Sequence, residues 1–174
     1  MNTISAFFCL LLSAVVANAA PPPTKPFTVD IKNAQSQVVG TATFSQAPHG
    51  VRIKLDIKNL PPGSHSLHIH QFAKCDPPDF KTAGPHFNPD GTGMNHDHAA
   101  GGLPAGDIPD FSLIVGADGT AHATVVAPHV TLGTDSHSVF SNGGTAMVIH
   151  DVATEATSAA PPRIACALIT QPQE

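Results

Sequence analysis

Hydrophobic and polar residues alternate along several short stretches of the chain, which predicts β-strands. In VRIKLDIK, residues 51–58, the apolar side chains Val51, Ile53, Leu55 and Ile57 fall on one face and charged side chains fall on the other. A period of two is typical of an antiparallel strand that is buried on one side. Similar runs predict further strands at 27–33, 38–45, 66–72, within 111–127, at 145–150 and at 163–169.

Glycine and proline separate these stretches and predict tight turns. The 174 residues include 14 Gly and 17 Pro, and Asp118-Gly119 predicts the tip of a hairpin over 111–127. Residues 73–108 show no sustained period, and a loop of this length in a compact domain is usually functional. The pattern predicts one all-β domain of about seven or eight short strands, arranged as a Greek-key sandwich or barrel.

Residues 1–20 predict an export signal that is cleaved from the mature chain. They contain no charged side chain, an apolar run over 6–16, and the small-residue pattern Ala17-Asn18-Ala19 before a proline cluster. A membrane anchor is the alternative, but the run is shorter than the ~20 apolar residues that a span requires. We therefore expect a secreted or periplasmic protein with a proline-rich tether over 21–26, a domain over 27–170 and a tail over 171–174.

Two cysteines, Cys75 and Cys166, remain after signal removal, because Cys9 lies inside the signal. In an exported protein an even pair predicts one disulfide, and two unrelated buried thiols are the alternative. The net charge of −5 provides no basic surface for nucleic acid or anionic lipid. We therefore expect no nucleic-acid partner and no membrane attachment after cleavage.

Four histidines form a candidate metal site. Strand alternation places His68 and His70 on the same face, where two imidazoles can bind one ion. His86 lies in AGPHFNP, whose Gly and Pro fix the backbone, and His150 ends an apolar strand. Paired histidines on a strand are, taken alone, equally well explained as ordinary surface residues. Four neutral nitrogens without a thiolate suit copper or zinc.

The order of the motifs resembles that of the copper/zinc superoxide dismutase family, in its exported bacterial-type branch. The resemblance spans residues 27–169 and rests on HIHQFAKC, TAGPHFNP, Gly106-Asp107, MVIH and RIACALI. It implies an eight-stranded Greek-key β-barrel or sandwich, immunoglobulin-like in architecture, with a long metal-binding loop. It also implies an enzyme that converts two superoxide anions to O2 and H2O2 by cycling copper between Cu(II) and Cu(I).

The resemblance assigns a role to each matching residue. The implied copper ligands are His68, His70, His86 and His150. In the family, the residue matching His86 also bridges copper to zinc and carries a catalytic proton. Arg163 matches the arginine that guides superoxide to copper and hydrogen-bonds it there. The Cys75–Cys166 disulfide would tie the metal loop to the barrel.

The zinc half of the family pattern is incomplete. Asp107 matches the zinc aspartate, but Pro104 stands three residues before it, where a zinc histidine is expected. His96 and His98 lie nearby, and one or both of them could complete a zinc site with His86 and Asp107. A solvated loop that holds no zinc is the alternative of equal weight.

Two further departures resemble the copper-only dismutases. The segment between His150 and Arg163 is shorter than in zinc-containing relatives, and Thr154 replaces a carboxylate that orients a ligand of each metal. The sequence therefore predicts copper as the cofactor, leaves zinc in doubt, and predicts a copper site more exposed than in two-metal enzymes.

The alternative function is a copper- or zinc-binding protein on the same scaffold that catalyses nothing. All four histidines and Arg163 are present, which favours the enzyme with superoxide as its substrate. A zinc hydrolase would need a positioned base and an open zinc position, and no HExxH spacing exists in the chain. Association into a homodimer is left open.

Overall fold

The computed structural model describes residues 25–91, 102–151 and 161–172. The predicted signal over 1–20, most of the tether over 21–26, and His96, His98 and Thr154 lie outside the described residues. Within the described ranges, no helix is long and apolar enough to cross a bilayer.

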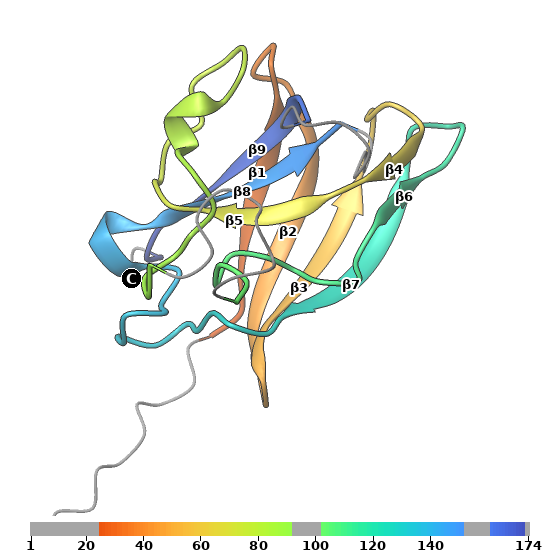
Figure 1. Ribbon diagram of the computed structural model, residues 1–174. Coiled ribbons are helices and arrows are strands. Elements are labelled where there is room, and N and C mark those ends of the chain that lie inside the picture. Colours follow the sequence, from red (N-terminus) through yellow and green to blue (C-terminus); the bar gives the residue numbers. More distant parts are fainter. Residues whose placement is uncertain (1–24, 92–101, 152–160, 173–174) are drawn as a thin grey trace, which may run out of the picture.

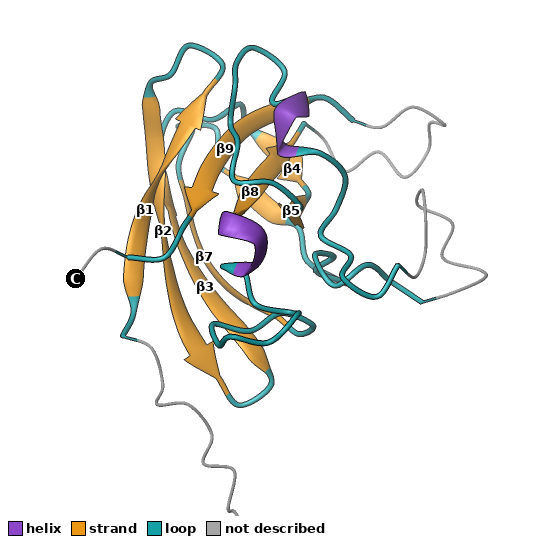
Figure 2. Ribbon diagram, turned by 90° about the vertical axis from the view of Figure 1, so that its left-hand side faces the viewer, coloured by secondary structure: helices purple, strands orange, loops and turns teal. Residues whose placement is uncertain are grey.

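The described residues form an antiparallel all-β fold, as the sequence predicts. Seven strands make one sheet in the order β5-β8-β9-β1-β2-β3-β7, which curls into a half-barrel (Figures 1 and 2). The strands are β1 Phe27–Asn33, β2 Val38–Ala47, β3 Gly50–Ile57, β4 Gly63–His65, β5 Leu67–His70, β6 Leu113–Val115, β7 Ala121–Ala127, β8 Thr145–His150 and β9 Arg163–Ile169. Two short 3-10 helices, η1 Lys81–Ala83 and η3 Ser141–Gly143, lie in the connections.

Alternation along the first three strands builds the inner core. The apolar residues predicted for one face of β3, from Val51 to Ile57, are fully buried, and the residues between them are not. Phe44 of β2 is equally buried and stacks on Phe27, with ring centroids 5.2 Å apart. Burial of each such side chain stabilises the fold by about 1.5–3 kcal/mol. A one-residue slip of the strand register would turn these side chains to the opposite face and lose several such contributions.

The structure differs from the sequence prediction in how two segments pair. The strand expected over 66–72 begins at Leu67 and ends at His70, and β4, just before it, pairs with β6 in a separate two-stranded sheet. The predicted turn is present, because Gly119 N–H donates to the Gly116 carbonyl at 2.9 Å. However, β6 pairs with β4 while β7 pairs with β3, so the hairpin strands diverge into different sheets.

Burial of β8 on both faces explains its unbroken apolar sequence. All of its residues are buried. One face packs Met147 and Ile149 into the inner core, and the other packs Ala146 and Val148 against Phe80. Phe80 belongs to residues 71–84, the disulfide loop, which therefore covers the outer face of the sheet.

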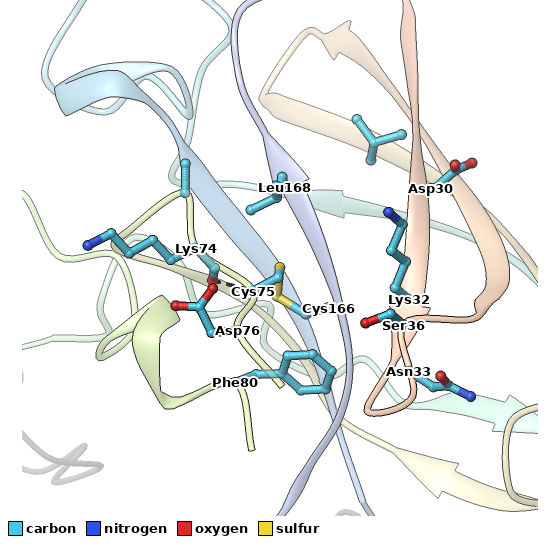
Figure 3. Close-up of a pocket in the computed structure, with 12 residues that line it drawn as sticks. Asp30, Lys32, Asn33, Ser36, Lys74, Cys75, Asp76, Phe80, Cys166 and Leu168 are labelled. Carbon is cyan, nitrogen blue, oxygen red and sulfur yellow. Dashed lines mark hydrogen bonds between the residues drawn. A yellow bond between two sulfur atoms is a disulfide. The ribbon is translucent and has the colours of Figure 1, made fainter. Parts of the chain in front are cut away.

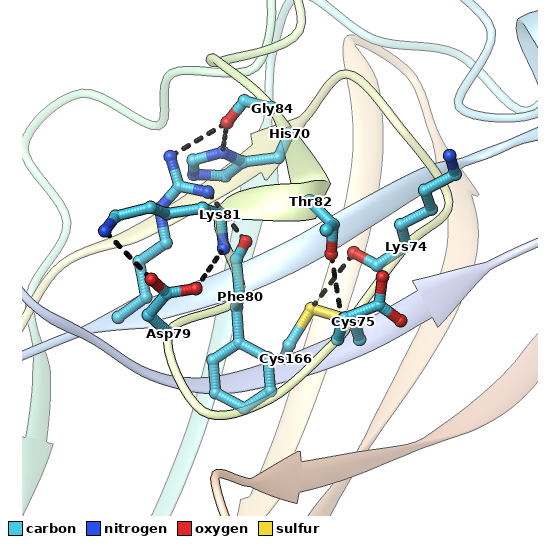
Figure 4. The surroundings of a disulfide bond; sticks show 11 residues. His70, Lys74, Cys75, Asp79, Phe80, Lys81, Thr82, Gly84 and Cys166 are labelled. Atoms are coloured by element: carbon cyan, nitrogen blue, oxygen red, sulfur yellow. Dashed lines mark hydrogen bonds and ion pairs between the residues drawn. A yellow bond between two sulfur atoms is a disulfide. The ribbon is translucent and has the colours of Figure 1, made fainter.

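A disulfide ties this loop to β9. Cys75 in the loop and Cys166 in β9 are bonded, with Cα atoms 5.7 Å apart (Figure 4), which confirms the predicted pair. Cys166 is in register with Val148 of β8. The bond therefore holds the disulfide loop over the strand that ends in His150.

Loss of the disulfide should lower the free energy of unfolding by about 4 kcal/mol, because the bond restricts the unfolded chain over a separation of 91 residues. We expect Cys75→Ala combined with Cys166→Ala to lower the urea midpoint. Reductant should lower the wild-type midpoint and leave that of the double variant unchanged. A wild-type midpoint that does not respond to reductant, with the thiols shown to be free, would contradict the prediction.

Candidate metal centre

Strand pairing brings the four predicted histidines together. His68 and His70 lie on β5, which pairs with β8, and cross-strand partners such as His70 and Ala146 project from the same outer face. His86 joins them from the disulfide loop's continuation through a β-bridge with His70. His150 ends β8. One ring nitrogen from each of the four histidines lies within 4.8 Å of the others.

Hydrogen bonds on the outer side of the cluster decide which nitrogens face inward. His70 Nδ1 donates to the Gly84 carbonyl at 2.9 Å, and His150 Nδ1 donates to the Pro161 carbonyl at 3.2 Å. A neutral imidazole carries one N–H, so the Nε2 atoms of His70 and His150 carry lone pairs. These two Nε2 atoms lie 3.2 Å apart. Two lone pairs directed at one another repel unless a cation lies between them, which is the arrangement expected of metal ligands.

Burial keeps His70 neutral. Its pKa is lowered from 6.5 to about 2, first because burial disfavours the charged imidazolium and second because of His86 nearby. The side chain is fully buried, whereas His68 and His86 are half-buried. His70 therefore presents a neutral imidazole, and a set of four imidazole nitrogens fits copper or zinc.

Arg163 and His70 share one acceptor. The Arg163 guanidinium donates from NH2 to the Gly84 carbonyl and from NH1 to the Phe80 carbonyl, both at 2.8 Å. Gly84 also accepts from His70, as Figure 4 shows. Burial lowers the pKa of Arg163 and Asp79 opposes this, so the group stays charged at neutral pH. Arg163 is paired with His150 across β8 and β9, which places a fixed cation beside the histidines.

Glycine is required at position 84. Its φ of +78° lies in the left-handed region, and a Cβ there would lie 2.5 Å from the Phe72 ring. This backbone conformation aims the carbonyl at both His70 and Arg163. In the sequence, Gly84 stands out only as part of the motif TAGPHFNP, because the partner of a backbone carbonyl leaves no signal in a sequence.

His65 hydrogen-bonds the backbone beside the histidine cluster. It is completely buried, with Nδ1 3.0 Å from the His150 carbonyl and Nε2 2.8 Å from the Pro61 carbonyl. It therefore braces the backbone of a candidate ligand and does not join the cluster.

The residues predicted for zinc fall in two groups. Asp107 is buried and accepts a hydrogen bond from His86 Nδ1 at 2.5 Å. His96 and His98 lie outside the described residues. Pro104 is buried, and its carbonyl accepts from Asp107 N–H at 3.0 Å.

A pocket of about 510 Å³ lies beside the disulfide, away from this chemistry. Cys75, Cys166, Phe80 and side chains of β1 such as Asp30 and Lys32 line it (Figure 3). None of the four histidines does. This pocket is therefore separate from the candidate metal centre.

Comparison with known proteins places the chain in a family. Residues 38–169 match the family described as copper/zinc superoxide dismutase (SODC). The chain is 39% identical over 149 residues to Cu-Zn superoxide dismutase 1 of Aquifex aeolicus (strain VF5), covering 80% of this chain and 85% of the relative. It is 32% identical over 133 residues to the Cu-Zn superoxide dismutase of Escherichia coli (strain K12), covering 71% and 75%.

Solved structures of two bacterial proteins have a similar fold. A SOD-like protein from Bacillus subtilis superposes with a TM-score of 0.70 at 30% identity, covering 82% of this chain and 97% of that chain. The Cu/Zn superoxide dismutase from Brucella abortus gives a TM-score of 0.62 at 27% identity, covering 83% and 99%.

The metal-free protein should lose stability as pH falls below 6.5. The unfolded chain protonates His70 near 6.5, whereas the folded chain keeps it neutral down to about pH 2, so the stabilisation is present above 6.5 and decreases below it. Relative to His70→Gln, we expect an extra slope of about 1.4 kcal/mol per pH unit or less, the value for one proton. Urea unfolding between pH 7 and 5 measures this, with exposed His122→Gln as the control. Identical slopes for wild type and His70→Gln would refute it.

Proposed function

The chain belongs to the copper/zinc superoxide dismutase family and dismutates superoxide, and we propose that four histidines hold its copper ion. The proposed ligands are His68, His70, His86 and His150. The observation that carries the proposal is the convergence of their ring nitrogens within 4.8 Å, two of them with lone pairs facing each other.

A copper ion held by these histidines would supply the one-electron redox chemistry that dismutation needs. The chain's own residues supply binding and protons. Arg163 would bind the anion, because its guanidinium is fixed by two backbone carbonyls beside His150 and keeps its charge. His86 would present the lone pair of Nε2, which binds copper or takes up a proton but not both at once, since its Nδ1–H donates to Asp107.

We place this activity in an oxidising compartment, secreted or periplasmic. The Cys75–Cys166 bond supports the location, because reducing compartments disfavour stable disulfides. The export signal over 1–20 and a homodimer stay predictions. For the cofactor, the family name includes zinc, and we propose that copper alone is sufficient here.

Copper loading should switch on the activity. We expect metal-free protein to be inactive in a superoxide-consumption assay and one copper per chain to restore the rate, with His150→Ala failing to bind copper at that stoichiometry. A matched surface variant, His122→Ala, should behave as wild type. If wild-type protein binds one copper tightly and consumes no superoxide, the non-catalytic metal-binding alternative is correct.

Removal of the fixed cation should slow superoxide capture. We expect Arg163→Ala to lower the rate by about tenfold or more and to weaken its dependence on ionic strength, because a positive charge at the docking point steers the anion. Arg163→Lys should keep part of the salt dependence while losing the paired hydrogen bonds. Pulse radiolysis at two salt concentrations measures both effects. An Arg163→Ala rate and salt slope equal to those of wild type would show that Arg163 does not guide the substrate.

A further inference from the structure

Asp107 and His86 stand too close for an ion to lie between them. Their Nδ1 and Oδ1 atoms are 2.5 Å apart, which is a direct hydrogen bond. Two ligands of one tetrahedral zinc, each about 2.0–2.1 Å from the ion, would be about 3.3 Å apart. Of the predicted zinc ligands, the described residues include only His86 and Asp107, fewer than the three or four protein ligands that a zinc site needs, so the described residues do not by themselves fit zinc.

The surrounding backbone supports the direct contact. Pro104, which has no ligand atom in its side chain, occupies the turn three residues before Asp107 and accepts the Asp107 N–H. Gly106 inserts between two neighbouring segments: its N–H donates to the Phe87 carbonyl at 2.8 Å, and its carbonyl accepts from Ile69 N–H at 2.9 Å. A Cβ at Gly106 would lie 2.0 Å from the Ile69 carbonyl oxygen. This close packing of Gly106 holds the neighbouring Asp107 beside Phe87 and Ile69, which adjoin His86 and His70 in the chain.

The hydrogen bond determines the state of His86. A carboxylate that accepts from Nδ1–H leaves the lone pair of the imidazole on Nε2, the other ring nitrogen, and holds the ring in one orientation. Both side chains are mostly buried, with 12% and 10% of the His86 and Asp107 side chains exposed. Little water competes for the bond, and a buried carboxylate needs such a partner.

We infer that Asp107 is a positioning residue for the copper ligand His86, filling by a direct hydrogen bond the place that zinc has in two-metal relatives. The inference rests on the proposed copper site. It makes Asp107 part of the copper centre, and it explains how His86 can be oriented although Pro104 replaces a zinc histidine.

Copper binding and metal content test the inference without relying on activity. Wild type, Asp107→Ala and Asp107→Asn would be incubated with equal amounts of Cu(II) and Zn(II) and analysed for both metals. Copper affinity would be measured by chelator competition and the copper environment by electron paramagnetic resonance. Asp110→Asn is the matched control, because Asp110 is exposed and its left-handed backbone accepts asparagine.

We expect wild type to retain one copper without a matching equivalent of zinc. Asp107→Ala should bind copper about 10–100-fold more weakly, with a changed copper hyperfine splitting. Asp107→Asn should fall between the two, since its amide oxygen still accepts a hydrogen bond, and Asp110→Asn should match wild type.

One zinc per wild-type chain that disappears in Asp107→Ala would overturn the inference and make Asp107 a zinc ligand. Copper affinity and spectrum unchanged in Asp107→Ala would overturn it as well. If circular dichroism shows that Asp107→Ala does not fold, Asp107→Asn decides, and a spectrum identical to wild type refutes the role. Wild type that binds no copper would instead refute the proposed function.

Discussion

The carbonyl oxygen of Gly84 is the contact on which the metal centre depends. A carbonyl has two lone pairs, and here one oxygen accepts from both His70 and Arg163. It sets the tautomer of the buried His70, a proposed copper ligand, and fixes the cation that would meet the substrate. Because one atom accepts from both groups, a shift of the disulfide loop would disturb His70 and Arg163 together.

The disulfide explains why a loop can provide such a contact. Loops are usually the mobile part of a fold, yet this one is bonded through Cys75 to β9 and covers β8 with Phe80. Its carbonyl groups at Phe80 and Gly84 then act as fixed acceptors. The oxidised bond is therefore coupled to the order of the site as well as to stability.

The metal centre lies on the outer face of the sheet, while the inner face carries the packed core. Three of the four histidines stand on strands, where neighbouring ladders hold the backbone, and the loop residue His86 is bridged to His70. A site built on strands is held more precisely than one built on loops. The buried His65 contributes in the same way by bracing the backbone at His150.

The sequence alone determined the properties that are local or that depend on residue chemistry. The alternation in β3 predicted one buried face, and the unbroken apolar run of β8 is that of a strand buried on both faces. The cysteine pair indicated the disulfide, and the motifs around His68, His86 and Arg163 indicated the family. These features depend on near neighbours in the chain or on side-chain identity.

Only the tertiary structure decided which distant groups meet. It separated β6 from β7 and aimed the Gly84 carbonyl at Arg163. It also set the buried His65 against the backbone of His150, and Asp107 against His86. Such contacts join residues tens of positions apart, and they are fixed by the packing of whole segments and by backbone direction. A sequence pattern states which face a side chain takes, but not which atom lies opposite it.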